Sequence, residues 1–162
     1  MVRFETLIEL HHDELYFYLR RMTYGSTSDA ADLTQETWLR AWQAFDRLRP
    51  GSNARAWLYR IATNCALNAL RKGRREYPWQ EDADLPDKAR LPHEQLEDSE
   101  DLELVLEEIG ALPPRQRAAV LLRYGHELCY AELANVLRCS EASARANVSL
   151  GVRRLRRELE AK

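Results

Sequence analysis

The sequence lacks the features that mark membrane proteins and disulfide-rich secreted proteins. No apolar run approaches the roughly 20 residues that a membrane-spanning helix needs. The first five residues include an acid and no apolar stretch typical of a signal peptide. The three cysteines, Cys65, Cys129 and Cys139, form no paired framework, which favours a reducing compartment. We therefore expect a cytoplasmic protein that does not associate with a membrane.

Motifs for catalysis and for cofactor binding are also missing. The chain has no glycine-rich phosphate loop, no G-x-S-x-G sequence and no acid pair in a supporting context. His126, Cys129 and Cys139 form a poor zinc set, because the two cysteines flank one short expected helix and no second paired motif accompanies them. We expect no enzyme, no catalytic residue, no metal, no cofactor and no small-molecule substrate.

The net charge of −2 conceals three blocks of different sign. Residues 1–75 carry 12 Lys and Arg against 8 Asp and Glu, residues 76–110 carry 2 against 13, and residues 111–162 carry 10 against 5. Blocks of like charge repel and solvate rather than form a packed core, and Pro78, Pro86 and Pro92 disfavour long regular structure in the acidic block. The pattern predicts two domains, residues 1–75 and 103–162, joined by an acidic flexible linker, residues 76–102.

Apolar residues recur at spacings of three and four in both basic blocks, and no alternating strand pattern appears. The expected class is all-α, with two small helical domains. In the N-terminal bundle the spacing predicts helices over residues 4–22, 30–46 and 54–72. An acidic amphipathic helix is expected from about residue 96 to Gly110, followed by helices over residues 114–123, 130–137 and 141–159.

The last two helices match the helix-turn-helix pattern, in which a short helix and a tight turn precede a longer helix. Ser140 is a good N-cap for the final helix. An apolar stripe (Ala144, Val148, Val152, Leu155 and Leu159) runs along that helix, and its other faces are polar and basic. An apolar back with arginines and polar groups on the front suits the major groove of DNA. The alternative is a solvated basic surface helix, which we consider less favoured in this context.

The third helix of the N-terminal block offers a second candidate surface. Its expected outer face combines Tyr59, Arg60, Thr63, Asn64 and Asn68 with further basic residues. Aromatic rings stack on unpaired bases, guanidinium groups hold phosphates and amides read base edges, so this mixture suits single-stranded nucleic acid. Alone the signal is weak, and Trp42 and Trp57 fit core packing better than base stacking.

Four stretches of sequence resemble the bacterial RNA polymerase sigma factors. D-A-A-D-L-T-Q-E-T-W-L-R-A-W at residues 29–42 resembles the second conserved region of that family, and N-A-R-A-W-L-Y-R-I-A-T-N-C-A-L-N-A-L-R-K at residues 53–72 resembles the promoter-melting part of that region. L-P-P-R-Q-R at residues 112–117 and Y-A-E-L-A at residues 130–134 resemble the fourth conserved region. Both motif sets stand in order within a short chain, as in the extracytoplasmic-function (ECF) class.

The resemblance implies three sets of functional residues. Core polymerase, through its β′ and β subunits, would be bound by Asp32, Gln35, Glu36, Leu39, Arg40 and Trp42. The promoter −10 element, as a single strand, would contact Ser52, Asn53, Tyr59, Arg60, Asn64, Asn68 and Arg71. The −35 duplex would be read by Arg115, Ser140, Ser143, Arg145, Asn147, Ser149 and Arg153. An anti-sigma factor, usual for this class, is a further candidate partner.

Two other functions fit the same residues. A stand-alone helix-turn-helix regulator would form a homodimer on a palindromic operator, with residues 29–72 as an effector or dimer domain. A helical adaptor would bind an acidic protein through its basic faces and would show no salt-dependent DNA affinity. If the protein is a sigma factor, the acidic linker should attract the basic domains. We therefore expect the DNA-facing surfaces to be masked in the free chain.

Overall fold

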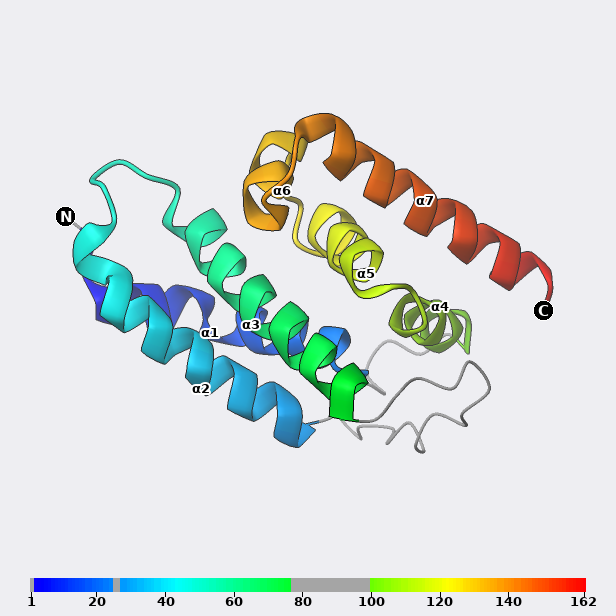
Figure 1. Ribbon diagram of the computed structural model, residues 1–162, viewed down its shortest axis with the longest axis horizontal. Helices are drawn as coiled ribbons and strands as arrows, with labels where there is room; N and C mark the ends of the chain where they lie inside the picture. The colour runs from blue at the N-terminus through cyan, green and yellow to red at the C-terminus, as the bar shows by residue number, and fades with distance from the viewer. Residues whose placement is uncertain (1, 25–26, 77–99) are drawn as a thin grey trace.

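The computed structural model describes residues 2–24, 27–76 and 100–162, and it contains helices and no strand within those ranges. The all-α class is therefore confirmed for the described residues. The order is α1 (Phe4–Met22), α2 (Thr27–Ala44), the 3-10 turn η1 (Phe45–Arg47), α3 (Ala54–Glu76), α4 (Glu100–Gly110), α5 (Pro114–Val120), the π-helical turn η3 (Leu121–Gly125), α6 (Tyr130–Leu137) and α7 (Glu141–Glu160), as Figure 1 shows. Most of the expected linker lies outside the described residues.

Helices α1, α2 and α3 form a three-helix unit because each carries one apolar stripe. Leu15 and Leu19 of α1, Leu33 of α2, and Leu58 and Ala62 of α3 are all buried between the helices. Helix α1 has the bounds expected from the sequence, whereas α2 begins and ends earlier than expected and α3 continues to Glu76. Because the apolar side of α2 packs against α1 and α3, its polar side faces solvent.

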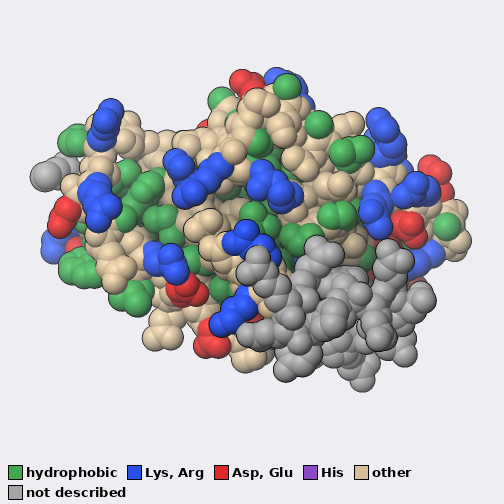
Figure 2. Space-filling view, viewed as in Figure 1, with side chains coloured by type: hydrophobic (Ala, Val, Ile, Leu, Met, Phe, Trp, Pro, Cys, Tyr) green, Lys and Arg blue, Asp and Glu red, His purple; other side chains and the backbone are tan. Residues whose placement is uncertain are grey.

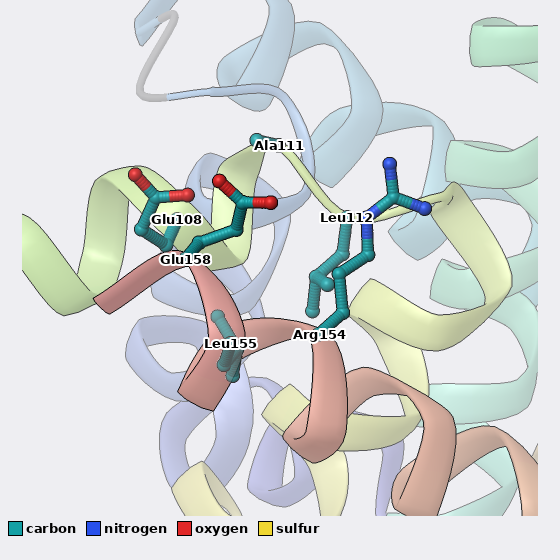
Figure 3. Close-up of a pocket in the computed structure, with 6 residues that line it drawn as sticks. All are labelled: Glu108, Ala111, Leu112, Arg154, Leu155 and Glu158. Carbon is teal, nitrogen blue, oxygen red and sulfur yellow. The ribbon is translucent and has the colours of Figure 1, made fainter. Parts of the chain in front are cut away.

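In the C-terminal half, α7 packs against α5 and α6. Ser140 caps α7, since its hydroxyl oxygen accepts a hydrogen bond from the Ser143 amide at 3.0 Å. Gly151 is buried where α7 crosses α5. Where α4 meets α7 a pocket of about 210 Å³ remains, and Figure 3 shows the Glu108 and Glu158 carboxylates side by side at one end of it, away from Arg154.

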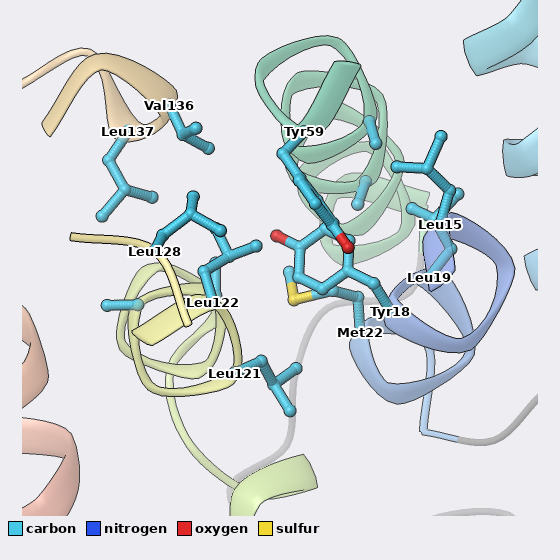
Figure 4. Packing of buried hydrophobic residues seen from close by; sticks show 14 of the residues in the cluster. Leu15, Tyr18, Leu19, Met22, Tyr59, Leu121, Leu122, Leu128, Val136 and Leu137 are labelled. Carbon is cyan, nitrogen blue, oxygen red and sulfur yellow. The ribbon is translucent and has the colours of Figure 1, made fainter. Parts of the chain in front are cut away.

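The two halves lie against one another and share a single hydrophobic cluster. Tyr18 of α1 and Tyr59 of α3 pack edge to face with ring centroids 5.4 Å apart. Figure 4 shows this pair facing Leu122 and Leu128 of the C-terminal half. We call this arrangement, in which α6 and the turn before it (residues 126–129) pack on α3, the closed form.

A buried arginine also joins the halves. Arg117 of α5 donates hydrogen bonds to the backbone oxygen of Met22 and the hydroxyl of Tyr24, and to the Leu112 carbonyl oxygen at 3.0 Å. Its guanidinium carbon lies 4.1 Å from the centroid of the Tyr24 ring. An arginine is rarely buried unless its donors are satisfied. These contacts with the end of α1 therefore help to hold the closed form.

Two expectations from the helical spacing are wrong. Tyr59 and Thr63 were expected on the outer face of α3, but both are buried. The reason is that α3 is covered on two sides, since α1 and α2 pack on its apolar stripe and the C-terminal half packs on part of its polar face. The expected helix over residues 114–123 is also interrupted, because α5 ends at Val120 and continues as the π-helical turn.

The turn before α6 supplies a test of local backbone strain. Glu127 has a φ of +58°, in the left-handed region that glycine adopts without cost. We expect Glu127→Gly to raise the free energy of unfolding by up to about 1 kcal/mol, measured by urea denaturation. Glu127→Ala removes the same exposed carboxylate and keeps the strain, so an equal gain from that variant would contradict this explanation.

Candidate protein and nucleic-acid interfaces

The exposed side of α2 presents the residues expected to bind core polymerase. Leu33, Thr37 and Ala41 are buried on the opposite side, and this spacing points the predicted set outward. Of the predicted residues, Leu39 and Trp42 leave 55% and 59% of their surface in solvent. The whole predicted set is exposed or half-buried: Asp32, Gln35, Glu36, Leu39, Arg40 and Trp42. Exposed large apolar side chains within a polar rim are typical of a docking surface.

The loop before α3 borders an open pocket of about 870 Å³. Phe4, Trp42, Phe45, Pro50 and Ser52 are among the residues that line it. The next residue, Asn53, closes the first turn of α3, where its side-chain oxygen accepts a hydrogen bond from the Ala56 amide at 3.0 Å. An asparagine at this position fixes the direction in which the loop enters the helix.

Three of the seven residues expected to contact the −10 element are hydrogen-bonded to the C-terminal half, although only Tyr59 of the three is buried. The Asn53 amide donates to a Glu132 carboxylate oxygen at 2.6 Å. The Tyr59 hydroxyl lies 2.7 Å from Nδ1 of His126, and the Arg60 guanidinium donates to the Asn135 side-chain oxygen at 3.2 Å. In the closed form these groups are engaged within the chain, along the contact between α3 and α6 (Figure 1).

His126 is at the centre of that contact. Its ring centroid lies 5.1 Å from the centroid of Tyr59 and 5.6 Å from that of Tyr18. Burial lowers the pKa of His126 below the usual 6.5; the Glu14 carboxylate opposes this shift and the Arg55 guanidinium adds to it. A neutral imidazole therefore fits the closed form better than a charged one.

Arg55 and Glu14 form the polar edge of the same contact. The Arg55 guanidinium donates to Glu14 at 3.0 Å and to the His126 carbonyl oxygen at 2.8 Å. Burial tends to raise the pKa of Glu14, but hydrogen bonds from Arg55 and His11 outweigh it and leave that pKa below 4.5. Burial also raises the pKa of Tyr59, so its hydroxyl stays protonated as a hydrogen-bond partner of His126.

The other predicted −10 residues are not held by the C-terminal half. Ser52 is exposed in the loop, and Asn64 is half-buried beside a pocket described below. Asn68 and Arg71 are exposed and hydrogen-bond one another along α3. The seven residues thus follow one helix and its entry loop, and in the closed form four of them make no hydrogen bond to the described residues of the C-terminal half.

The predicted −35 residues of α7 lie opposite its buried stripe. Ala144, Val148 and Leu155 are buried, whereas Ser140, Ser143, Arg145, Ser149 and Arg153 are exposed and Asn147 is half-buried. The Arg145 guanidinium lies over the Tyr130 ring, 4.1 Å from its centroid, and pairs with Glu141 at 3.5 Å. Basic side chains outnumber acidic ones on the face of the described residues shown in Figure 2.

Arg115 has a structural contact that its predicted role did not anticipate. Its guanidinium donates to the Leu137 carbonyl oxygen at 2.6 Å and so satisfies an acceptor at the C-terminal end of α6. Glu132 and Asn135 carry no sequence signal that predicts their contacts with α3, and the sequence indicated only a poor zinc-ligand role for His126. No group of three or more His, Cys, Asp or Glu in the described ranges is arranged to hold a metal ion. None of the described helices is long and apolar enough to span a membrane.

Two family models match the chain. Sigma-70 region 2 matches residues 7–76, and Sigma-70 region 4 matches residues 102–155. Together with the all-helical fold, these matches define the class as a sigma-70-type transcription initiation factor.

Relatives narrow the class further. The ECF RNA polymerase sigma-E factor of Salmonella typhimurium is 33% identical over 137 residues, which cover 77% of this chain and 71% of that protein. SigE of Mycolicibacterium smegmatis is 34% identical, over 96% of this chain and 61% of that protein. SigG of Mycobacterium tuberculosis is 49% identical over 75 residues, which are 46% of this chain but only 20% of SigG. The chain belongs to the ECF family of RNA polymerase sigma factors.

Solved structures share the fold. The sigma factor RpoE of Bartonella quintana, crystallised with the anti-sigma factor NepR, matches with a TM-score of 0.82 and 26% identity over 97% of this chain and 96% of that one. CnrH, solved in complex with the cytosolic domain of CnrY, matches with a TM-score of 0.72 and 23% identity over 98% of this chain and 88% of that one. The second likeness concerns the fold alone.

Proposed function

We propose that this protein binds core RNA polymerase and directs it to promoters, where it recognises the −35 duplex and helps to open the −10 element. The observation that carries the proposal is the presence of both sigma-70 regions in order, each with an exposed polar face on a buried apolar core. The protein would work in the cytoplasm as an initiation factor and not as an enzyme.

The α2 surface would dock on the polymerase. Leu39 and Trp42 provide apolar anchors, and the Glu36–Arg40 pair, 2.9 Å apart, lies beside them at the rim. The opposite side of α2 is packed against α1 and α3, so docking requires no rearrangement of the N-terminal unit. Residues 1–75 and 103–162 would act as separate functional units, with residues 76–102 as their connection.

The DNA-facing groups are divided between the two units. Ser143, Arg145 and Arg153 of α7 are exposed and suited to phosphates and base edges in a major groove. The loop at Ser52 and the polar face of α3 would take the single strand after melting. The hydrogen-bonding groups of Asn53, Tyr59 and Arg60 are released only when α6 and the turn before it leave α3, so promoter opening would require the closed form to open.

The RpoE structure was solved with an anti-sigma factor, and its fold agrees with this chain over nearly the whole length. We infer that an anti-sigma factor is a candidate partner here as well. A protein that stabilises the closed form would keep the −10 groups engaged within the chain without binding to them directly.

Leu39→Ala is expected to weaken the binding of core RNA polymerase at least about fivefold. The exposed leucine contributes little to folding, but a buried anchor at an interface is worth about 1–3 kcal/mol. Leu10→Ala, at a 66% exposed leucine of α1, is the matched control and should bind normally. Binding is measured by fluorescence anisotropy of the labelled chain, and activity by run-off transcription.

The proposal fails if the wild-type chain does not associate with core polymerase. A stable homodimer that binds a palindromic operator without polymerase would instead support the stand-alone regulator. Absence of any salt-dependent DNA affinity, with or without polymerase, would support the adaptor.

A further inference from the structure

An arginine-lined pocket of about 410 Å³ lies between the two halves of the chain. Its charged lining residues are all arginines: Arg40 of α2, Arg47 of η1, Arg60 of α3 and Arg138 at the end of α6. Trp57 and Ile61 of α3 contribute apolar surface, and no acidic side chain lines the pocket. The first three arginines belong to the N-terminal unit and the fourth to the C-terminal half, so the complete pocket exists only in the closed form.

The positive charge of this pocket is only partly balanced. Arg40 pairs with Glu36 at 2.9 Å. Arg60 donates to Asn135, whose neutral amide offsets no charge. Like charges gathered in a hollow repel one another, and an anion that enters the hollow relieves that repulsion. Guanidinium groups suit phosphate in particular, because their planar forks donate two parallel hydrogen bonds to its oxygens.

The backbone at Arg138 provides a second observation. Arg138 ends α6 with a φ of +55° and a ψ of +49°, the left-handed conformation in which glycine or asparagine usually ends a helix. An arginine there costs stability relative to glycine, because its Cβ approaches the following carbonyl oxygen. Strain of this kind is often retained where the side chain has a role, and this side chain lines the pocket.

We propose that the pocket binds an oligophosphate anion of the kind a nucleoside triphosphate presents, and that the bound anion stabilises the closed form. Arg138 would contact the phosphates from one half while Arg40, Arg47 and Arg60 contact them from the other. A nucleoside attached to the phosphates would lie against Trp57 and Ile61. Because the ligand requires α6 to lie on α3, its binding opposes exposure of the −10 surface by mass action.

The probes are sodium tripolyphosphate and ATP, each titrated without Mg²⁺ into the full-length chain in an isothermal titration calorimeter at physiological salt. Both should bind the wild type and raise its melting temperature. Equal affinities would assign recognition to the phosphate chain alone, and tighter binding of ATP would assign part of it to the nucleoside. Both results support the oligophosphate site.

Arg138→Gly is the decisive variant, because it removes the guanidinium and relieves the left-handed strain. It should fold at least as stably as the wild type and bind both probes at least tenfold more weakly. Arg156→Ala, which removes an exposed arginine of α7, is the control and should bind them as the wild type does. No detectable binding up to millimolar probe, or equal loss in the two variants, would overturn the proposal.

Arg40 and Arg60 of the pocket also belong to the predicted polymerase and −10 sets, so Arg138 is the residue that separates the anion site from the proposed function. Arg138 belongs to neither the predicted polymerase surface nor the predicted promoter-binding sets. Arg138→Gly should therefore still bind core polymerase and support run-off transcription. If the probes do not bind but transcription is normal, the anion site is wrong and the proposed function stands. If the probes bind but the chain does not bind polymerase, the proposed function is wrong and the anion site stands.

Discussion

Gly151→Ala is expected to lower the free energy of unfolding by about 1–3 kcal/mol, the usual cost of adding a carbon to a filled core. A Cβ built on Gly151 would lie 2.6 Å from Cγ2 of Val120 and 3.5 Å from the backbone oxygen of Gln116. The Val120 side chain is short and buried, so it has little room to move. The expected relief is a shift of α7 away from α5.

That shift should also affect DNA binding. Helix α7 carries Ser143, Arg145 and Arg153, and its apolar stripe on α5 and α6 sets the direction in which they face. We expect Gly151→Ala to weaken binding of a −35 duplex at least several-fold in the presence of core polymerase. Core binding through α2 should be unaffected, because Gly151 lies in the other half of the chain.

Gly73→Ala is the matched control, since it makes the same change in another helix. A Cβ at Gly73, within α3, meets no atom within 4 Å. Alanine is favoured over an unhindered helical glycine by up to about 1 kcal/mol, so this variant should be more stable than the wild type. Urea denaturation followed by circular dichroism measures both changes, and shifts of the same sign would contradict the role assigned to Gly151.

Local signals in the sequence predicted much of the fold. The bounds of α1 and α6 agree with the sequence prediction, because both helices have regular apolar spacing. The N-cap at Ser140 was likewise predictable, since a serine before a helix offers an acceptor to a free amide. The outward position of Leu39 on α2 follows from helical periodicity around Leu33, Thr37 and Ala41. The expectation that Trp42 packs in the core is wrong, because 59% of its surface is exposed.

The closed form could not be predicted in this way. Its contacts join residues far apart in the chain, such as Tyr59 with His126 and Met22 with Arg117. Periodicity reports which face of a helix is apolar, and the covered face of α3 is polar and is satisfied by hydrogen bonds instead. The sequence predicted masking of the DNA-facing surfaces by the acidic linker. In the described residues, α6 and the turn before it lie against the polar face of α3. Most of the acidic linker, residues 77–99, lies outside the residues that the structure describes.

Acidification from pH 7.5 to 5.5 is expected to open the closed form. In that form burial keeps the pKa of His126 below 6.5, whereas an exposed His126 in the open form would titrate near 6.5. Below pH 6.5 the open form therefore binds a proton that the closed form rejects. The contribution of His126 to closure is complete above pH 6.5 and decreases as the pH falls toward its lowered pKa.

The groups around His126 determine the size of this effect. Helix α1 presents Glu14 and Tyr18, and α3 presents Arg55 and Tyr59. The Glu14 carboxylate favours a charged imidazole, but burial and Arg55 act against it and the net shift is downward. Glu14 itself stays ionised throughout this range, because its own pKa lies below 4.5, so its titration belongs to a lower pH window.

We expect binding of the single-stranded −10 element by the free chain to become several-fold tighter between pH 7.5 and 5.5, because Asn53, Tyr59 and Arg60 are released. His126→Gln keeps a polar side chain of similar reach but cannot take up a proton, so the same pH change should have a much smaller effect on it. This variant also separates His126 from His11, which contacts Glu14 at 3.0 Å and is retained. Fluorescence anisotropy with a labelled oligonucleotide measures binding at each pH. An equal pH response in the two proteins would show that protonation of His126 does not control closure, and that the opening of the chain depends on its partners instead.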